Sequence, residues 1–457
     1  MMHSMKAVML AVVALLAIPV VAAFPEQDAL PGLDAALDNL SGDSRTCLEC
    51  HAAKEPGRVG DWLKSRHASR GVSCIVCHKA KTDDPDATDC PGTKNNAALK
   101  ITPIVTPNDC GRCHGDKQEE FARSKHARTW EIQTDFIRDP WLRGMTSDIE
   151  RETGCYQCHG SDLSGGITTG SWPNEGCGRI NPDGSLGTCA MCHTFHRFSK
   201  AEARKPDTCG QCHLGPDHPQ NEIYYESKHG KRYLSESTEW DFTPDSGDWR
   251  PGRDFTAPTC AVCHMSGVSG LETTHDVGER LKWEAQAPLT VTNRDHDGDE
   301  ERAKMTTVCA NCHSSRWTEG HFDRYDRAVI HYNDNYFAPV KKRMDALYTA
   351  GTLTRWPMFD EEIEWVFYEF WHNEGRRARM GSAMMGPDYA WWHGFYDLKR
   401  SWREFMLLAD EVEHDGHGTP VYVPGSGGKN LTNEDTPTLP GGWDTVPRLR
   451  GTPDSPK

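Results

Sequence analysis

The sequence predicts a mainly α-helical protein with extensive loops, in which a loop-rich N-terminal part precedes a C-terminal bundle of long helices. Three observations lead to this fold class. One pentapeptide, Cys-x-x-Cys-His, occurs eight times before about residue 320. The chain contains 41 Gly and 28 Pro, many of them between these copies, which favours turns over strands. Beyond about residue 321, apolar residues recur at steps of three and four, the spacing of an amphipathic helix.

The first residues have the pattern of a secretory signal peptide. Lys6 provides a positive charge, an apolar run from Ala7 to Val21 follows, and small residues precede Phe24. The run is short for a membrane span, which needs about 20 apolar residues, although a retained anchor is the alternative. We therefore expect residues 1–23 to be a signal peptide cleaved near Ala23 and Phe24, and the mature protein to be soluble and exported to the periplasm.

The repeated pentapeptide is the pattern that attaches c-type haem. Its two sulfurs bond the two vinyl groups of one porphyrin, and the histidine that follows binds the iron. A zinc ribbon, a redox dithiol or a disulfide framework would account for one copy, but not for a histidine after every pair. We therefore predict eight covalently bound haem c groups, which we number with their motifs in chain order.

The eight motifs divide the chain before residue 320 into two regions. Three lie in residues 24–145, a predicted trihaem region, and five lie in residues 146–320, a predicted pentahaem region. Only 37% of residues are hydrophobic, so we expect the flat apolar cofactors to fill much of the interior. The attachment cysteines are Cys47, Cys50, Cys74, Cys77, Cys110, Cys113, Cys155, Cys158, Cys189, Cys192, Cys209, Cys212, Cys260, Cys263, Cys309 and Cys312. The histidines that follow them are His51, His78, His114, His159, His193, His213, His264 and His313.

The C-terminal third has a helical pattern without haem motifs. One apolar stripe consists of Tyr325, Val329, Tyr332, Tyr336, Val340, Met344 and Tyr348, in which Pro339 is expected to cause a kink. The pattern continues with Ile363, Val366, Phe367, Phe370, Trp371, Trp402, Phe405, Met406 and Ala409. We expect a helical region over residues 321–413 and an extended tail over residues 414–457.

A haem iron with histidine on both sides is closed to substrates and transfers electrons, so the chain is expected to supply further histidines. Three of them share the context serine, basic residue, histidine, small residue, and each precedes a motif: His67, His126 and His229. Other candidate ligands are His196, His275, His321 and His393. Exposure at the surface is the alternative for each, and it is the favoured interpretation for His414 and His417.

The order of motifs resembles that of the octahaem hydroxylamine oxidoreductase family. Local strings strengthen the resemblance, such as Cys189-Ala-Met-Cys-His-Thr-Phe-His196, Leu214-Gly-Pro-Asp-His-Pro219 and Met385-Gly-Pro-Asp-Tyr389. The last five motifs are similar to those of pentahaem nitrite reductases, in which the first of the five is catalytic. The resemblance therefore implies that the fourth haem, on His159, is open to substrate.

The family also carries an aspartate–histidine pair that handles protons beside this haem, and Asp217 and His218 match it. Oxidation of hydroxylamine releases protons together with electrons, so a base that titrates near neutrality is required. The alternative is a turn after the sixth motif with His218 as an iron ligand. Tyr224 and Tyr225 are expected either to donate into this pocket or to pack in the core.

In oxidative members of the family, a tyrosine cross-links to the catalytic porphyrin of a neighbouring subunit and locks a homotrimer. Tyr389 is the best match, with Tyr396 as the second choice, so the resemblance implies one haem modified by a tyrosine and a trimeric assembly. Ordinary aromatic packing is the alternative, because Trp391, Trp392 and Phe395 surround these positions.

The leading functional hypothesis is an enzyme that oxidises hydroxylamine, or hydrazine, to nitric oxide or nitrite at one open haem. Electrons would leave through seven haems with histidine on both sides to a soluble or membrane-bound cytochrome c. The alternatives are a reductase of nitrite or hydroxylamine at the same site, and an electron-transfer protein without catalysis. The formal charge of −16 argues against nucleic acid as a partner.

Two further features have weaker interpretations. Cys90 and Cys177 lie outside the motifs and would be able to form a disulfide in an oxidising compartment. The acidic stretch 295–301 resembles part of a calcium loop but lacks the full ligand spacing, so a solvated acidic turn is favoured.

Overall fold

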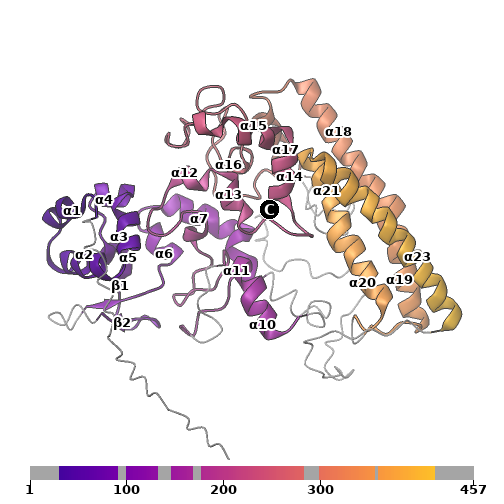
Figure 1. Cartoon of the computed structure of the whole chain (residues 1–457), viewed down its shortest axis with the longest axis horizontal. Coiled ribbons are helices and arrows are strands. Elements are labelled where there is room, and N and C mark those ends of the chain that lie inside the picture. The colour runs from indigo at the N-terminus through magenta and orange to yellow at the C-terminus, as the bar shows by residue number, and fades with distance from the viewer. Residues whose placement is uncertain are drawn as a thin grey trace, which may run out of the picture.

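The structure is a computed structural model that describes residues 30–90, 99–131, 146–167, 176–281, 298–355 and 359–416. These residues form mostly helices joined by loops, which confirms the predicted fold class. In Figure 1, short N-terminal helices lie at one end of an elongated molecule, short helices and loops fill the middle, and long helices lie side by side at the other end. The predicted signal peptide, His417 and most of the predicted tail lie outside the described residues.

The N-terminal end is a small helical unit with a short sheet beside it. The helices are α1 (Leu33–Asn39), α2 (Gly42–Lys54), α3 (Pro56–Leu63), α4 (Arg66–Ser69) and α5 (Cys74–His78). Leu48, Val59 and Trp62 form their buried core. The strands β1 (Lys79–Ala80), β2 (Thr88–Asp89) and β3 (Lys100–Ile101) are antiparallel with β3 in the centre, which places Ile101 opposite both Lys79 and Thr88.

The middle of the molecule carries the third to eighth motifs on short helical turns. A helical turn brings residues three and four apart to one face, so both cysteines and the histidine of a motif point the same way. The elements are α6 (Pro107–Gly111), α7 (Gly115–Arg123), η2 (Lys125–Arg128), α10 (Asp148–Glu150), η3 (Arg151–Cys155), α11 (Tyr156–His159), η4 (Cys189–Met191), α12 (Lys200–Ala203), α13 (Pro206–Gly210), α14 (Gln220–Glu226), α15 (Lys228–Glu236), η5 (Ser237–Glu239), α16 (Cys260–His264) and α17 (Asp299–Cys309).

The C-terminal part consists of long helical segments interrupted by π-helical turns. Its elements are α18 (Ser315–Tyr332), η6 (Asn333–Phe337), α19 (Ala338–Ala350), α20 (Glu362–Tyr368), η7 (Glu369–Glu374), α21 (Gly375–Met384), α22 (Pro387–Ala390), η8 (Trp391–Tyr396) and α23 (Asp397–Asp415). Pro339 lies in the first turn of α19, where its missing N–H is tolerated, and the π-helical turn η6 directly precedes it. The predicted disruption at Pro339 is therefore a π-helical turn between two helices of one long segment.

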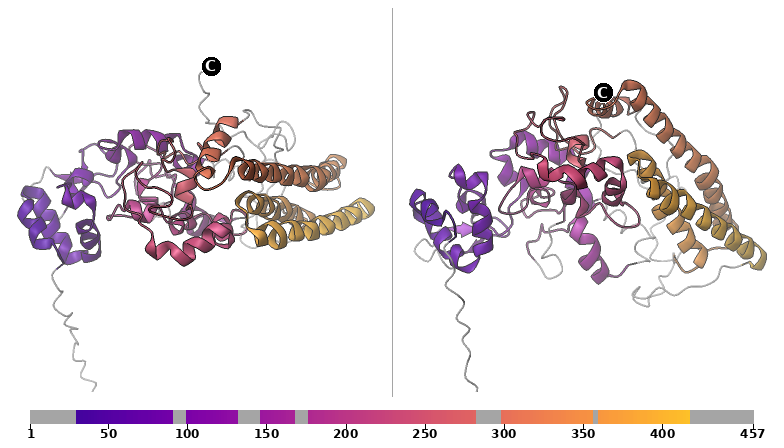
Figure 2. Two further views of the ribbon diagram at one scale, coloured as in Figure 1. Left: turned by 90° about the horizontal axis from the view of Figure 1, so that it is seen from above. Right: turned by 45° about the horizontal axis from the view of Figure 1, so that its top comes forward.

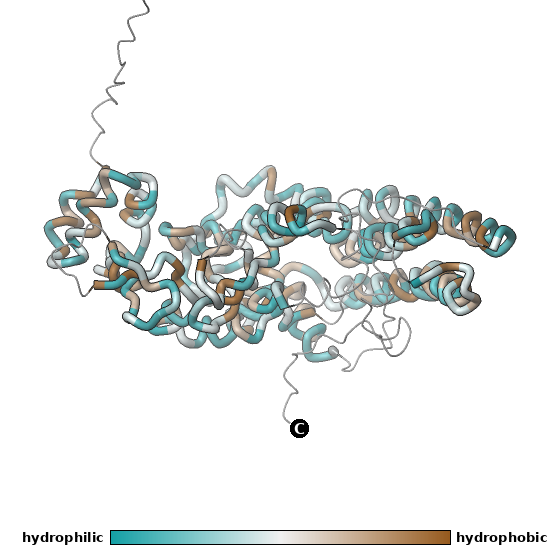
Figure 3. Tube along the Cα trace, turned by 90° about the horizontal axis from the view of Figure 1, so that it is seen from below, coloured by the Kyte–Doolittle hydropathy of each residue, from teal (hydrophilic) through white to brown (hydrophobic). Residues whose placement is uncertain are grey.

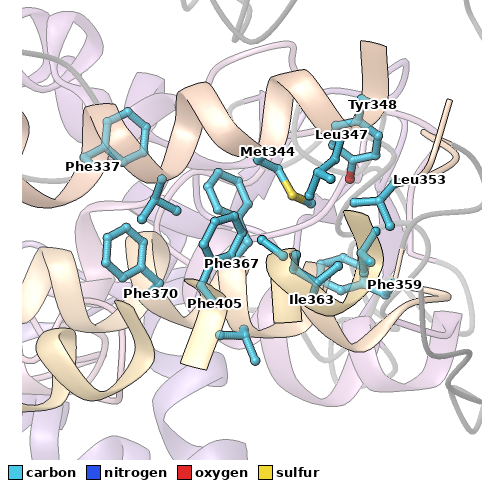
Figure 4. Packing of buried hydrophobic residues seen from close by; sticks show 14 of the residues in the cluster. Phe337, Met344, Leu347, Tyr348, Leu353, Phe359, Ile363, Phe367, Phe370 and Phe405 are labelled. Carbon is cyan, nitrogen blue, oxygen red and sulfur yellow. The ribbon is translucent and has the colours of Figure 1, made fainter. Parts of the chain in front are cut away.

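These helices form two layers around an aromatic core. Seen from above, α18 and α19 form one layer, and the segment with α20 and α21 lies with α23 in the other (Figure 2). Figure 4 shows Phe337, Met344 and Leu347 directed from one layer towards Phe367, Phe370 and Phe405 of the other. The predicted stripe thus forms the core of the C-terminal bundle.

The rest of the molecule has a smaller apolar core. A second cluster, centred on Trp249 and Phe255, packs beneath α14, α15 and α16. Along the chain, apolar residues occur in short stretches among polar ones (Figure 3). Among the residues that the structure describes, no helix is long and apolar enough to cross a membrane.

Candidate functional site: histidine pairs and an ionised aspartate–histidine pair

The serine in the repeated serine–basic–histidine context is a helix N-cap. Its hydroxyl accepts a backbone N–H in the first turn of the following helix, which satisfies a donor that has no partner within the helix. The bonds are Ser65 with Ala68 N–H at 3.1 Å, Ser124 with His126 N–H at 3.3 Å and Ser227 with Gly230 N–H at 3.2 Å. In each case the serine is the N-cap and the helix begins at the basic residue that follows it. The histidine therefore lies in the first turn of the helix.

The structure places five of the predicted distal histidines opposite motif histidines. The ring centroids of these pairs are between 5.8 and 6.4 Å apart. The pairs within the described residues are His67 with His114, His126 with His213, His196 with His78, His229 with His313, and His275 with His193.

This spacing fits an iron between the two rings. An imidazole nitrogen lies about 2 Å from a bound metal, so two nitrogens on opposite sides are about 4 Å apart and the ring centroids about 6 Å apart. Several of these rings also have a partner at Nδ1, which leaves Nε2 for a metal. His275 Nδ1 contacts Glu120 Oε2 at 3.2 Å, and His78 Nδ1 contacts the carbonyl oxygen of Thr102 at 2.8 Å. The residues present therefore fit haem with two histidine ligands.

Burial keeps two of these histidines, His126 and His193, neutral, as metal ligands must be. It lowers the pKa of His126 to about 4, and the nearby His213 contributes. Burial likewise lowers the pKa of His193 to about 4, with a contribution from His275. Both rings are thus unprotonated near neutral pH.

Two predicted ligands have other surroundings. His321 stacks on Trp317, with ring centroids 5.7 Å apart, and Trp317 itself stacks on His313 at 3.8 Å. His393 is exposed, bonds to Asp388 at 2.6 Å through Nδ1 and stacks on Tyr389. The structure does not bring either ring opposite a motif histidine in the way that the five pairs show: His321 is half-buried against Trp317, and His393 is exposed. His414 lies exposed in α23, as expected.

Asp217 and His218 form a hydrogen-bonded pair beside the fourth motif. Nδ1 of His218 bonds to Oδ1 of Asp217, and the charges of both residues act on the pKa of His159, which burial lowers. The ring of His213 has two histidine neighbours, both edge to face: His126 with centroids 5.8 Å apart and His218 with centroids 6.2 Å apart. Among the described residues, no histidine ring is placed opposite His159 in the way that the five pairs show.

The surroundings of this pair favour an ionised aspartate and a basic histidine. Burial raises the pKa of Asp217, but the hydrogen bond and charge of His218, with the charges of His372 and Arg376, bring it down to about 2. Burial lowers the pKa of His218, but its hydrogen bond to Asp217 more than compensates and raises it above its ordinary value. A base whose pKa lies near neutrality can accept and release protons at working pH.

The C-terminal helices supply residues to this pair that the sequence analysis did not identify. Nη1 of Arg376 donates to Oδ2 of Asp217 at 3.1 Å, although the two residues are 159 positions apart. Nε2 of His372 lies 3.9 Å from the same oxygen, and Tyr368 stacks on the His372 ring with centroids 4.3 Å apart. The signal in the sequence that could have identified these residues is the occurrence of polar residues, His372 and Arg376, at helical spacing within an apolar stripe.

The predicted tyrosines lie at different depths. Tyr389 is half-buried, its backbone N–H donates to Oε1 of Glu226 at 3.1 Å, and burial raises its pKa. Tyr396 is exposed beside Trp391 and Trp392, so these aromatic side chains form a surface patch instead of a packed core.

The hydroxyls of Tyr224 and Tyr225 bond to groups other than Asp217 and His218. The Tyr224 hydroxyl donates to the carbonyl oxygen of Pro258 at 3.1 Å, and the Tyr225 hydroxyl donates to Oδ1 of Asp207 at 2.8 Å. Tyr224 belongs to the second apolar cluster, so the packing interpretation is the one that the structure supports.

The two cysteines outside the motifs lie in different parts of the molecule. Cys90 acts on the pKa of Cys47, which burial raises, whereas Cys177 is buried near Cys192 and Cys158. No disulfide joins Cys90 to Cys177. Contacts between attachment cysteines instead link motifs: Cys158 contacts Cys212, Cys209 contacts Cys260, and Cys110 contacts Cys189.

Comparison with known proteins gives two family matches. Residues 174–357 match the family described as "Seven times multi-haem cytochrome CxxCH", and residues 31–79 and 109–174 match "Cytochrome c554 and c-prime". The chain is 28% identical over 356 residues to a Kuenenia stuttgartiensis protein named "Probable nitrite reductase-hydroxylamine oxidoreductase fusion protein". The match covers 67% of this chain and 38% of that protein, so the chain spans about two fifths of the length of this curated relative.

Solved structures share the fold over most of the chain. A structure described as "Hypothetical multiheme protein" is 26% identical, with a TM-score of 0.75, and covers 85% of this chain and 99% of its own. A Kuenenia stuttgartiensis "reducing HAO-like protein complex" has a TM-score of 0.63 and covers 86% of this chain and 88% of its own. At 21% identity, the second likeness is one of fold.

Proposed function

Because the chain belongs to the multihaem c-type cytochromes related to hydroxylamine oxidoreductase, we propose that it oxidises hydroxylamine, or hydrazine, at the haem attached beside His159. The products would be nitric oxide or nitrite from hydroxylamine. The chain carries covalently bound haem c. The eight attachment motifs support a complement of eight haems.

One observation carries the proposal: the Asp217–His218 pair lies beside His159. When bound, haem would supply an iron that coordinates the substrate nitrogen and takes up its electrons. His218 would accept the protons that leave the substrate, and ionised Asp217 would orient the imidazole and stabilise its charged form. Arg376 holds the other oxygen of Asp217, which fixes the direction in which His218 faces.

The facing histidines support an exit for electrons through the other haems. We infer that seven haems have two histidine ligands, five of them from the pairs described above. Contact of Cys158 with Cys212, and of Cys209 with Cys260, supports a route from the fourth motif through the sixth to the seventh. A c-type cytochrome, soluble or membrane-bound, would accept the electrons.

One relative supports chemistry on small nitrogen compounds, because it is named for nitrite reductase and hydroxylamine oxidoreductase. Tyr389 is half-buried and the nearby Trp391, Trp392 and Tyr396 are exposed, which is compatible with a cross-link to the haem of a neighbouring subunit in a homotrimer. We also propose that the protein is exported to the periplasm.

The test is hydroxylamine-dependent reduction of cytochrome c by the purified haem-loaded protein. His218→Ala should lower kcat by about 10²- to 10⁴-fold, the usual contribution of a positioned acid–base group, with the haem content unchanged. His414→Ala, a surface substitution in α23, is the control and should retain the wild-type rate. Equal turnover in the His218→Ala protein would refute the role of this pair.

The direction of the reaction is tested on the same preparation. Oxidation predicts faster hydroxylamine-dependent cytochrome c reduction than nitrite consumption with a reduced donor, and a Tyr389–porphyrin adduct in haem peptides analysed by mass spectrometry. The opposite rates without an adduct would assign the site to reduction. Absence of any five-coordinate, high-spin iron signal would leave an electron-transfer protein.

A further inference from the structure

A cluster of three carboxylates lies at the far end of the C-terminal bundle, between α19 and α20. Asp360 and Glu361 directly precede α20, and Glu364 lies in its first turn. Oxygens of the three side chains lie within 4.8 Å of one another. Figure 4 shows Tyr348, Leu353, Phe359 and Ile363 gathered at this end of the aromatic core.

Two of the three side chains are removed from solvent. Glu364 is 0% exposed and Glu361 is 8% exposed. Oε2 of Glu364, Oε2 of Glu361 and Oδ1 of Asp360 are buried atoms with no hydrogen-bond partner among the described residues. A buried charged oxygen without a partner is strongly unfavourable, so this arrangement requires a compensating positive charge or a proton.

The neighbouring groups that the structure describes supply hydrogen bonds but no cation: Asp360 bonds to Glu361, and backbone N–H groups bond to Glu361 and Glu364. The Tyr348 hydroxyl donates to Oε1 of Glu364, which accounts for one oxygen. The Trp365 indole N–H donates instead to the carbonyl oxygen of Phe359 at 3.0 Å. The Arg355 guanidinium lies 4.6 Å from the centre of the Tyr348 ring, and within the described residues no ion pair joins it to the cluster.

We propose that Asp360, Glu361 and Glu364 bind a calcium ion. Carboxylate oxygens are hard ligands that suit calcium and magnesium rather than softer metals. Calcium takes six to eight oxygens in irregular geometry, whereas magnesium usually retains several waters, for which a buried cluster is less suited. The ion would join the two residues that directly precede α20 to its first turn.

The experiment uses the purified haem-loaded protein after treatment with chelator. Titration with CaCl2 should raise its thermal unfolding midpoint, since an ion that binds the folded state stabilises it. Terbium should bind the same site and emit on excitation of tryptophan, because Trp365 directly follows Glu364. In the wild-type protein, added calcium should displace terbium and so reduce the emission. Glu364→Gln should weaken calcium binding at least about tenfold and abolish this terbium emission.

Glu362→Gln is the matched control, because Glu362 is exposed on the same helical turn. It removes the same charge and should leave both responses intact. If Glu364→Gln fails to fold, Asp360→Asn at the half-buried edge of the cluster should give the same loss of binding.

Three results would overturn the proposal. An unfolding midpoint that is unchanged by calcium at millimolar concentration would assign shared protons to the carboxylates in place of an ion. Unchanged calcium affinity in Glu364→Gln and Asp360→Asn would place any bound calcium elsewhere. An equal response to MgCl2 would contradict the assignment to calcium.

Discussion

Replacement of Asp217 by asparagine tests the electrostatics of the candidate site most directly. The substitution keeps the shape of the side chain but removes the charge that bonds to His218 and Arg376. His218 should then lose the interaction that raises its pKa, while burial still lowers it. Its imidazole would become neutral at lower pH than in the wild-type protein.

The size of the effect follows from the pKa of Asp217. Burial raises that pKa, and His218 and the other cations lower it from 3.8 to about 2 overall. This difference corresponds to about 2.5 kcal/mol at 1.36 kcal/mol per pH unit. The coupling between the two groups is reciprocal, so the charge of Asp217 that is stabilised by His218 in turn raises the pKa of His218.

The sign is opposite for the two groups. The contribution of ionised Asp217 to stability is present above its unfolded pKa and is lost as pH falls towards about 2. The contribution of charged His218 is present below its unfolded pKa and is lost as pH rises through its raised folded pKa. A base must be neutral to accept a proton, so wild-type turnover should rise as pH increases through the raised pKa of His218.

The assay is the pH dependence of kcat/KM for hydroxylamine in the haem-loaded proteins. We expect the acid limb of the profile to move to lower pH in Asp217→Asn, because His218 loses the interaction that raises its pKa, and the maximal rate to fall because the imidazole is less well oriented. Asp323→Asn removes an exposed charge in α18 and should leave the limb in place. An unmoved limb in Asp217→Asn would refute the argument.

Three further substitutions test the C-terminal bundle. Phe405→Ala empties a fully buried position and should lower the free energy of unfolding by about 3–5 kcal/mol. Leu407→Ala, at an exposed position, should change this free energy little. Denaturant titration measures both. Gly381→Ala would place a methyl group against the backbone of Tyr389 and should cost about 1–3 kcal/mol by the same titration, with any Tyr389 adduct reduced in mass spectra. Burial raises the pKa of Glu374 to about 7, so ionisation of this group costs stability as pH rises from about 4.5 to about 7. Glu374→Gln should therefore stabilise the protein by about 1–3 kcal/mol at pH 8 relative to pH 5. A difference in stability that does not depend on pH would contradict this.

The helical bundle could be predicted because its pattern is local. The stripe from Tyr325 to Tyr348 repeats at helical spacing, and Tyr332, Val340 and Met344 are indeed buried between the layers. The form of the disruption near Pro339 could not be predicted in the same way. A π-helical turn depends on how the helices on both sides pack, which the residue types alone do not specify.

The candidate site likewise has parts that could be predicted from the sequence and parts that could not. Serine caps made His67, His126 and His229 recognisable, because an N-cap is fixed by neighbouring residues. Their partners were not recognisable: His67 faces His114, and His126 faces His213, far along the chain. His321 lies in the second turn after the serine cap of α18, and His393 lies in the π-helical turn η8, so neither ring stands in the first turn after a serine cap.

The sequence by itself determined the cofactor chemistry of this protein. Two cysteines and a histidine within five residues make a haem attachment site in any helical turn, so eight copies were sufficient to identify it. Only the tertiary structure decided which histidines face each other and that Arg376 reaches Asp217 across 159 residues. Attachment depends on covalent bonds within one short segment, whereas the environment of a reactive pair depends on the packing of helices that are remote in the chain.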